Sequence, residues 1–227
     1  MSQKIELVIF DWDGTLFDSV GQIVKSLQYA AQQFQQPLTD EAAKSIIGLG
    51  LPEVMQVLFP QVPELHQDLL QCYADHYVAH SKGDKWFQGV AELLTDLKKQ
   101  GIKLAVATGK SRRGLDRVLT QTHSHQLFDT TRAASETKSK PDPLMLQQIL
   151  TELDVAVEHA VMVGDTSYDL EMAQNINMQR IGVSYGVHDV ATLQQYQPLA
   201  IVADIDALRQ YLYAQFSLPV TTVASYA

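Results

Sequence analysis

The sequence lacks several features that would point to other classes of protein. Cys72 is its one cysteine, so a disulfide within the chain is impossible and nothing points to an oxidising compartment. Basic residues are scarce: 17 Lys and Arg stand against 26 Asp and Glu, which gives a net charge of -9 with no Lys/Arg-rich block. A field of that sign opposes nucleic acid and anionic membranes, so we expect neither as a partner. A small metabolite is the more natural ligand.

Long apolar runs are also missing from the start of the chain. The run that precedes Asp11 is too short for the core of a signal peptide or for a membrane span. Together with the single cysteine, this leads us to expect a cytoplasmic protein. The 46% of hydrophobic and 19% of charged residues are ordinary for a globular protein and supply enough apolar surface for a core. At 227 residues the chain can form one domain with a sizeable insertion.

Strand and helix patterns alternate through most of the chain. Residues 5–10 are apolar and β-branched apart from Glu6, and Asp and Gly follow them, which predicts a buried strand. Further strands are predicted at 102–107, 160–163, 180–183 and 200–202, with helices at 90–100, 113–122, 144–153, 168–174 and 205–216. Such alternation predicts an α/β fold, a Rossmann-like parallel sheet with helices on both faces.

A helical insertion interrupts this alternation after the first strand. The spacing of apolar residues predicts helices over 19–36 and 40–47, from Pro52 onward, and over 64–79, with no strand among them. We therefore expect residues 17–85 to form an all-helical cap, and residues 1–16 with 86–227 to form the α/β core. The tail from Ser217 gives no clear structural expectation.

Polar side chains follow the predicted strands where each strand ends. Asp11 and Asp13 end the first strand, Thr108 ends the second, and Asp165 and Asp169 follow the third. Ligands of open parallel sheets bind beyond the carboxyl ends of the strands. Side chains two residues apart in a strand point the same way, so Asp11 and Asp13 can share one pocket. Paired carboxylates at such an edge suit a hard cation and a phosphate.

Lys140 completes an ordered set of four motifs, because it stands before Pro141-Asp142-Pro143 at a loop–helix junction. The set resembles the haloacid dehalogenase-like (HAD) hydrolase superfamily, specifically its capped phosphatases, and looks like phosphoglycolate phosphatases and their relatives. The motifs extend from Asp11 to Asp169, and the pattern of elements matches almost the whole chain. The first motif is highly specific and the last fairly so, whereas the Thr and Lys motifs are weak alone.

The resemblance implies a Mg²⁺-dependent phosphatase that acts on a small phosphomonoester. It makes Asp11 the nucleophile that forms an aspartyl-phosphate, and Asp13 the general acid-base. Mg²⁺ would be held by the Asp11 carboxylate, the main-chain carbonyl of Asp13 and Asp165, which suits an ion that takes few protein carboxylates. Asp169, one helical turn after Asp165, would support these ligands from behind.

Thr108 and Lys140 are the residues that the resemblance implies for the nonbridging phosphate oxygens. Without a cation there, Asp11 would repel its own substrate. Lys138 is a nearby competitor for this role, and only the proline-rich sequence after Lys140 favours Lys140.

Three other sequence patterns could indicate further functional sites. Gly182-Val183-Ser184-Tyr185-Gly186 matches a G-x-S-x-G nucleophile elbow, but no acid lies between Ser184 and the last histidine, so we interpret it as a strand-end loop beside the cleft. His76 and His80 have metal-compatible spacing without a third ligand, which favours a solvated helix face. Gly48-Leu49-Gly50 is either a cap loop that reaches the substrate or a helix stop.

Several alternatives stay open at this level. A phosphosugar mutase would use the same residues, and only the cap could distinguish it. A signalling receiver domain also pairs a phosphoacceptor Asp with Mg²⁺, Thr and Lys, although Asp13 and the helical insertion count against it. A phosphate-binding module without turnover is the third alternative. The physiological substrate, the oligomeric state and the role of Trp12, in the leaving-group pocket or in the core, are not determined.

Overall fold

The computed structural model describes residues 4–83 and 85–216. These residues form a six-stranded parallel sheet in the order β5-β4-β1-β6-β7-β8. Its strands are β1 (Leu7–Phe10), β4 (Lys103–Thr108), β5 (Thr130–Ala133), β6 (Ala160–Gly164), β7 (Gln179–Val183) and β8 (Ala200–Val202). The central strand β1 is fully buried because it pairs with β4 on one side and β6 on the other.

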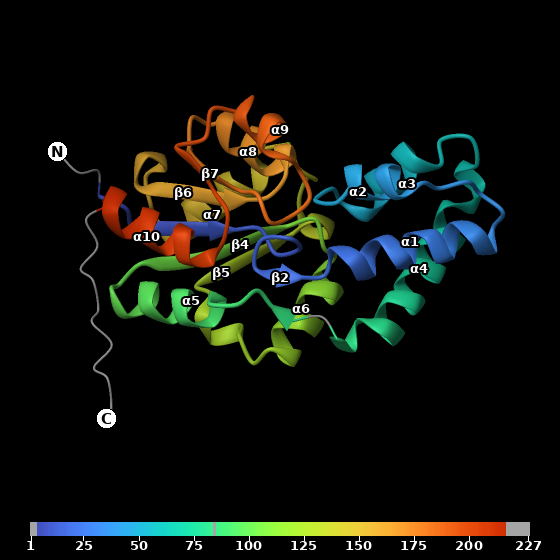
Figure 1. Ribbon diagram of the computed structural model, residues 1–227, viewed down its shortest axis with the longest axis horizontal. Helices are drawn as coiled ribbons and strands as arrows, with labels where there is room; N and C mark the ends of the chain where they lie inside the picture. The colour runs from blue at the N-terminus through green and yellow to red at the C-terminus, as the bar shows by residue number, and fades with distance from the viewer. Residues whose placement is uncertain (1–3, 84, 217–227) are drawn as a thin grey trace.

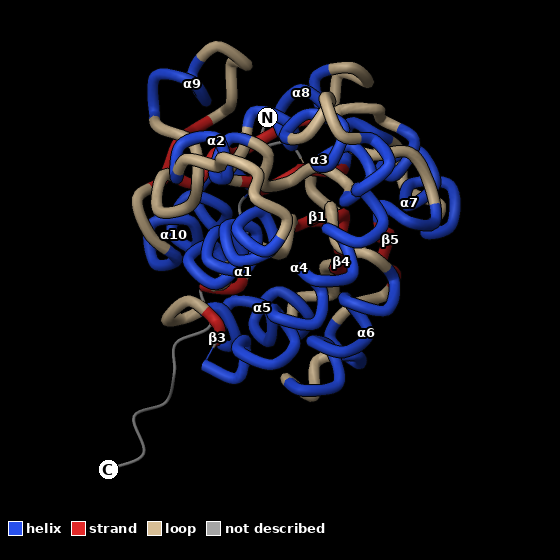
Figure 2. Tube along the Cα trace, turned by 90° about the vertical axis from the view of Figure 1, so that its right-hand side faces the viewer, coloured by secondary structure: helices blue, strands red, loops and turns tan. Residues whose placement is uncertain are grey.

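Alternate residues of the strands enter two separate hydrophobic cores, as the period of a strand requires. Val8 and Phe10 of β1 belong to one core, and Leu7 and Ile9 belong to the other. The first core is covered by α5 (Val90–Lys99), α6 (Arg112–Gln121) and α10 (Ile205–Phe216), and the second by α7 (Leu144–Leu153) and α8 (Ser167–Gln174). Figure 2 shows the strands between α8 on one side and α5 with α6 on the other. The predicted α/β sheet with helices on both faces is confirmed.

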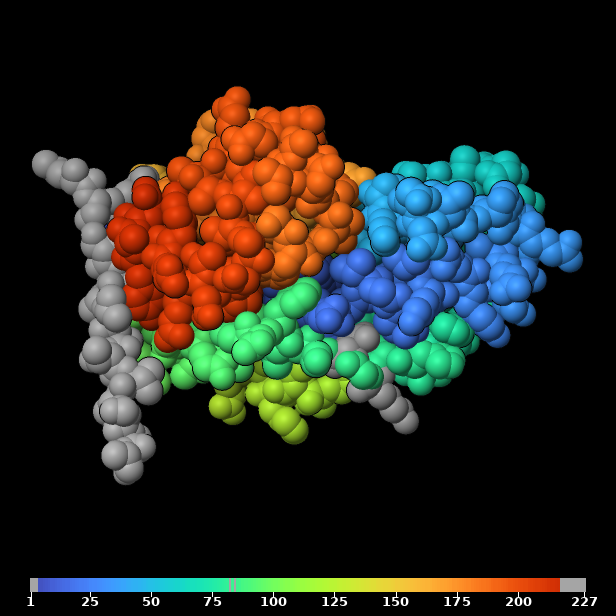
Figure 3. Space-filling model, viewed as in Figure 1, coloured from blue at the N-terminus to red at the C-terminus, as the bar shows by residue number. Residues whose placement is uncertain are grey.

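The helices between β1 and β3 gather at one end of the molecule, to the right in Figure 1 and in blue and cyan in Figure 3. They are α1 (Val20–Gln33), α2 (Asp40–Ser45), α3 (Leu51–Leu58) and α4 (His66–His80). Their apolar residues form a third core of their own, to which Leu27, Met55 and Leu69 contribute fully buried side chains. We call α1 to α4 and their connections the helical segment.

A short antiparallel ribbon joins the two ends of the helical segment to each other. It pairs β2 (Phe17–Asp18) with β3 (Lys85–Trp86), so the chain leaves and re-enters the α/β part at one place. The remaining short elements are α9 (Val190–Gln194) and 3-10 turns at Pro63–Leu65, Ser81–Gly83, His125–Leu127, Ala134–Glu136 and Val157–His159.

Four helices or strands of the structure were missed by the sequence analysis. The ribbon of β2 and β3 lies at the ends of the range 17–85 that was expected to be entirely helical, and its two-residue strands are too short to show a pattern. The other two are β5 and α9. β5 is an edge strand of sequence Thr-Thr-Arg-Ala with half-exposed central residues, so it carries neither an apolar run nor β-sheet alternation. α9 is only five residues long, which is too short for helical periodicity to show. The other predicted helices and strands exist, with ends that differ by a few residues.

Among residues 4–83 and 85–216, no helix combines the length and the apolar character that crossing a membrane requires. The tail from Ser217 lies outside the described residues.

Candidate active site

Asp11 and Asp13 lie in a tight turn at the carboxyl end of β1. The main-chain N–H of Asp11 still donates to the carbonyl of Val163 on β6 at 2.9 Å, so the strand geometry continues through Asp11. Gly14 then takes a positive φ of 84°, and a Cβ there would lie 2.3 Å from Oδ2 of Asp165. Position 14 therefore requires glycine for two reasons: the positive φ, and the lack of space for a side chain beside Asp165. The turn brings β1 directly against the loop after β6.

Lys140 is buried among carboxylates. Its Nζ lies 2.6 Å from Oδ1 of Asp11 and 2.6 Å from Oδ1 of Asp169. The side chain of Lys140 is 0% exposed, and those of Asp11 and Asp169 are 1% and 0% exposed. Segments far apart in sequence, the end of β1, the loop before α7 and the start of α8, thus meet in one ion cluster. Lys138, in contrast, is exposed and pairs with Asp142, so the structure places Lys140 at the site.

The second oxygen of Asp169 is also occupied. Oδ2 accepts from the N–H of Thr166 at 3.1 Å and from its hydroxyl at 2.7 Å, in a capping box that begins α8. Gly164 leaves the room for this, because a Cβ there would lie 2.3 Å from the Cβ of Asp169. Both oxygens of Asp169 are therefore used, one to bind Lys140 and the other to cap the start of α8.

Asp165 is fully buried and is held by two donors. Its Oδ1 accepts from the Thr15 hydroxyl at 2.7 Å, and its Oδ2 accepts from the N–H of Val187 at 2.8 Å. The loop that supplies Val187 approaches closely, since a Cβ on Gly186 would lie 2.2 Å from Oδ2 of Asp165. These contacts fix the carboxylate in one orientation.

Oδ2 of Asp11 is buried and has no hydrogen-bond donor in the described part of the chain. One carboxylate oxygen from each of Asp11, Asp165 and Asp169 lies within 4.8 Å of the others. A buried anion without a donor is costly, and a divalent cation would compensate it. The residues therefore fit a hard cation such as Mg²⁺. Asp11 offers an oxygen without a donor among the described residues, and Asp165 accepts only from neutral donors, whereas Asp169 already pairs with the cation of Lys140.

Asp13 lines the same cleft as Asp11 but has its own set of partners. Its Oδ1 accepts from the hydroxyl of Ser19 at 2.5 Å and lies 2.9 Å from Nζ of Lys110. Ser19 precedes α1 at the N-cap position, yet its side chain makes no capping bond because it is turned toward Asp13. Asp13 is 8% exposed and therefore remains reachable from the cleft.

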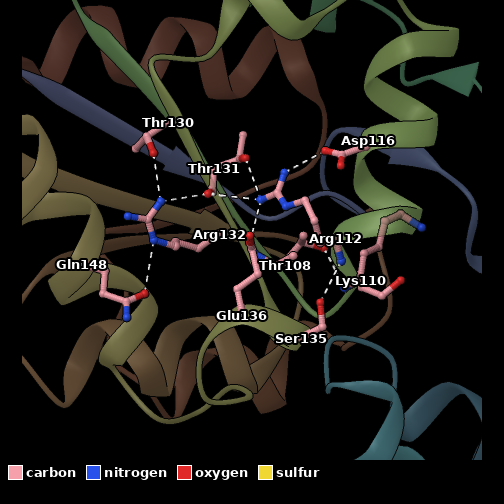
Figure 4. A network of polar contacts seen from close by, with 12 residues as sticks. Thr108, Lys110, Arg112, Asp116, Thr130, Thr131, Arg132, Ser135, Glu136 and Gln148 are labelled. Carbon is pink, nitrogen blue, oxygen red and sulfur yellow. Dashed lines mark hydrogen bonds and ion pairs between the residues drawn. The ribbon is translucent and has the colours of Figure 1, made fainter.

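Thr108 ends β4 beside these residues and is 1% exposed. Its Oγ1 accepts from the N–H of Lys110 at 3.2 Å. Figure 4 shows Thr108 and Lys110 close to Arg112 of α6. The four predicted motifs thus converge at one edge of the sheet, as the strand-end argument requires.

A cleft of about 520 Å³ opens at this edge, between the sheet and the helical segment. Asp11, Asp13 and Thr108 lie at its base. The helical segment supplies a mostly apolar wall, and its residues on the cleft are Ile23, Leu27, Ile46, Ile47, Gly48, Leu49, Leu51, Val54, Gln71, Tyr73, Ala74, Asp75, Tyr77, Val78 and Ala79. The Gly48-Leu49-Gly50 loop reaches the cleft through its first two residues.

Burial sets the ionisation of the cluster. Burial, together with the charge of Asp169, raises the pKa of Asp165 to about 7, although the bonds from Thr15 and Val187 act in the opposite direction. Burial also raises the pKa of Asp11 above its usual range, against the attraction of Lys140. Burial alone would lower the pKa of Lys140, but the charges of Asp11 and Asp169 outweigh it and raise that pKa. Lys140 is therefore a fixed cation.

Comparison with known proteins identifies the family of this chain. Residues 8–183 match the model of the family described as haloacid dehalogenase-like hydrolase. The chain belongs to the haloacid dehalogenase-like hydrolase family.

Relatives in this family carry several names. The chain is 29% identical over 219 residues to a phosphoglycolate phosphatase of Psychrobacter arcticus, which covers 91% of this chain and 95% of the relative. It is 32% identical over 212 residues to the tyrosine-protein kinase PtkA of Mycobacterium tuberculosis. This alignment covers 91% of this chain and 72% of PtkA. The crystal structure of a predicted phosphatase from Clostridium acetobutylicum superposes with a TM-score of 0.83 at 27% identity, covering 93% and 99%. These findings confirm the resemblance and the classification as a HAD-type phosphoric monoester hydrolase.

The competing motifs of this HAD chain do not form other sites. The Ser184 hydroxyl donates to the carbonyl of Val202, and Nδ1 of His188 accepts from the N–H of Ser167, so the two side chains are engaged elsewhere. The rings of His76 and His80 stack 4.1 Å apart. Nδ1 of His76 contacts the Ser26 hydroxyl and Nδ1 of His80 contacts the His76 carbonyl, which is not the arrangement of a shared metal.

Trp12 packs inward. It is 0% exposed and contacts the rings of Phe17, Trp86 and Phe128 in the core on the α5 side of the sheet. Successive side chains of an extended segment point to opposite sides, so the Trp12 side chain points away from the pocket that Asp11 and Asp13 share.

Four residues of the site received no role in the sequence analysis: Thr15, Ser19, Lys110 and Val187. Lys110 and Thr15 lie inside motifs, and a cation beside Thr108 was a visible signal. Ser19 and Val187 carry no sequence signal, because Ser19 resembles an ordinary helix cap and Val187 acts through its main chain.

Proposed function

We propose that this HAD-type phosphatase hydrolyses a small phosphomonoester in two steps through an aspartyl-phosphate on Asp11, with Mg²⁺ as cofactor. The main support for the proposal is the set of partners of the two Asp11 carboxylate oxygens. One of its oxygens is neutralised by Lys140, and the other is buried without a donor beside Asp165, at the base of the cleft. A carboxylate held in this way is arranged for a ligand that the chain itself does not supply.

Asp11 is the proposed nucleophile. Its attack on phosphorus would expel the alkoxide and leave the phosphoryl group on the carboxylate, which divides one difficult displacement into two easier steps. Lys140 and the hydroxyl of Thr108 would meet the charge on the nonbridging oxygens, and Lys140 would also reduce the repulsion between Asp11 and an incoming phosphate. Asp169 would act only by holding Lys140 in place.

Asp13 is the proposed general acid-base. It lies two residues after Asp11 and faces the cleft. In the first step it would protonate the leaving oxygen, and in the second it would take a proton from the water that hydrolyses the intermediate. The Ser19 hydroxyl and Lys110 would fix the orientation of this carboxylate.

Asp11, Asp165 and the main-chain carbonyl of Asp13 are the proposed Mg²⁺ ligands. When bound, Mg²⁺ would balance the charge of the carboxylates and polarise a phosphate oxygen. Thr15 and Val187 would keep Asp165 oriented for this role.

Residues 17–85 are the proposed cap, and residues 1–16 with 86–227 the proposed core. The separate hydrophobic core of the helical segment and the β2–β3 ribbon at its ends support this division. The cap would exclude water and select the small phosphorylated metabolite. The cytoplasm remains the expected location, on the single cysteine.

The test is phosphate release from a panel of phosphomonoesters that includes phosphoglycolate and sugar phosphates, with Mg²⁺ or EDTA, for the wild type and for Asp11→Asn. We expect Mg²⁺-dependent release that falls by a factor of about 10³ or more in Asp11→Asn. Full activity in Asp11→Asn would refute the nucleophile. Isomerised sugar phosphate without phosphate release would indicate a mutase, and phosphate binding without turnover would indicate a binding module.

A further inference from the structure

The cleft has a cationic wall opposite the apolar wall of the helical segment. This wall is the start of α6, which begins directly after the Thr108 loop. Among the described residues that line the cleft, the charged ones beyond Asp11 and Asp13 are Lys110, Arg113, Arg117 and Asp75. Lys110 is already paired with Asp13. The unexplained charges on this wall are therefore those of Arg113 and Arg117, which we call the arginine pair.

The arginine pair occupies one face of α6. The two residues are four positions apart, which places them on the same side of a helix and about 6 Å apart along its axis. Because α6 begins beside Lys110 at the reaction centre, the pair lies progressively farther from Asp13 along the same wall. A substrate with its phosphate at Asp11 would extend past these two guanidinium groups.

Neither member of the arginine pair has a carboxylate partner among the described residues. Arg117 donates to the neutral side chains of Ser81 and Gln121 and lies over the ring of Tyr77, 5.3 Å from its centre. Arg113 is exposed and makes no hydrogen bond or ion pair with any described residue.

Three of the four arginines outside the cleft pair with carboxylates, and the fourth, Arg180, donates to the main-chain carbonyls of Tyr196 and Met178. Arg112 pairs with Asp116 at 2.9 Å and with Glu136 at 2.7 Å, and Figure 4 shows it turned toward β5. Arg132 and Arg209 also pair with carboxylates. In a chain with 26 acidic and 17 basic residues, acidic partners are plentiful. Two arginines that face a cleft without such partners are available for an anion from outside.

We propose that the arginine pair binds a second anionic group of the substrate, so that the enzyme prefers phosphomonoesters whose leaving group carries a carboxylate or a further phosphate. Arginine suits this role because its planar fork of donors matches either oxyanion. The apolar wall opposite would contact the carbon skeleton between the two anionic ends. This inference rests on the proposed phosphatase activity and adds a determinant of substrate specificity to it.

The test compares two series of synthetic esters with Mg²⁺ present. One series consists of ω-carboxyalkyl phosphates with two to six carbons, and the other of alkyl phosphates of equal length. For the wild type we expect kcat/KM to be roughly 10- to 100-fold higher for the carboxylated ester at the best-fitting length, as expected for hydrogen bonds between charged groups. The advantage should shrink as salt is added, because part of the wall is exposed.

Variants of the arginine pair decide whether these residues are responsible. Arg113→Gln, Arg117→Gln and the double variant should lose most of the carboxylate preference, with the larger rise in KM on the carboxylated series. Lys25→Gln is the matched control, because it removes one positive charge on exposed α1 surface outside the cleft. Thermal denaturation verifies that each variant is folded.

The outcomes separate this inference from the proposed function. Hydrolysis of both series without a preference, or a preference that survives in the folded double variant, overturns the role of the arginine pair and leaves the phosphatase proposal intact. No phosphate release from either series overturns both. A preference lost in the double variant and kept in Lys25→Gln supports the inference.

Discussion

Nζ of Lys140 lies 2.6 Å from Oδ1 of Asp11, and both side chains are almost completely excluded from solvent. Removing one partner of such a pair leaves a buried charge without compensation, which typically costs about 3 to 5 kcal/mol. The pair also joins the loop before α7 to the end of β1. It therefore combines a structural task with the proposed binding of phosphate.

Lys140→Gln should consequently affect both stability and activity. We expect the free energy of unfolding to fall by about 3 kcal/mol and phosphate release to fall by at least about 10²-fold, because Asp11 and Asp169 would then repel each other and the substrate. Urea denaturation and steady-state kinetics measure the two effects. Lys138→Gln is the control, since Lys138 is exposed and pairs only with Asp142. Equal behaviour of the two variants would contradict the assignment of Lys140.

Asp13→Ala should slow turnover in a way that depends on the leaving group. If Asp13 protonates the leaving oxygen, alkyl phosphates should lose about 10² to 10⁴ in kcat, and p-nitrophenyl phosphate much less, because nitrophenolate leaves without a proton. Rapid-quench measurement of the first turnover separates this step from hydrolysis of the intermediate. Asp18→Ala, an exposed carboxylate on β2, serves as control. A uniform loss across all leaving groups would argue for a purely structural Asp13.

Metal binding should stabilise the protein more at high pH than at low pH. Burial raises the pKa of Asp165 to about 7, whereas an unfolded aspartate titrates near 3.8, so the metal-free protein takes up a proton on folding between these values. Its stability should therefore decline as the pH rises through that window. Mg²⁺ needs the carboxylate form and competes with the proton, so the increase in Tm with Mg²⁺ should be larger at pH 8 than at pH 5.5.

Thermal scans at both pH values with Mg²⁺ or EDTA measure this effect. Asp165→Asn should abolish most of the Mg²⁺-induced increase in Tm at pH 8. A Tm increase that is the same at both pH values, or that persists in Asp165→Asn, would count against the proposed ligands.

Gly109→Ala should impair activity by separating the helical segment from the sheet. A Cβ on Gly109 would lie 2.5 Å from the carbonyl oxygens of both Gly48 and Leu49, and main-chain atoms cannot move aside cheaply. We expect kcat/KM to fall by about tenfold or more, because closure over the cleft contributes to positioning.

Gly21→Ala is the matched control for Gly109→Ala. Gly21 lies in α1 with nothing within 4 Å of an added Cβ, and alanine there should stabilise the helix by about 0.5 to 1 kcal/mol with unchanged kinetics. A Gly109→Ala enzyme with wild-type kinetics would show that this approach of the two parts is not needed.

The α/β fold was predictable because its signals are local. The strands β1, β4 and β6 are apolar runs that are followed by or end in Asp, Thr and Gly-Asp, and the helices α5, α6 and α7 are amphipathic over two or more turns. β5 was not predictable in this way, since its place in the sheet comes from pairing with β4 and from the contacts of Arg132 with Gln148 and Glu152 of α7, not from an apolar pattern.

The sequence by itself determined which residues stand at the carboxyl ends of the strands, because chain order and strand period place Asp11, Asp13, Thr108 and Asp165 at one edge of a parallel sheet. Only the tertiary structure decided which of them interact. It placed Lys140 between Asp11 and Asp169, turned Ser19 and Lys110 to Asp13, and sent Trp12 into the core. These choices depend on contacts between segments more than 100 residues apart in some cases, and on main-chain groups such as Val187 N–H that any residue would supply. Local pattern contains no information on such contacts, so they became visible only once the chain was folded.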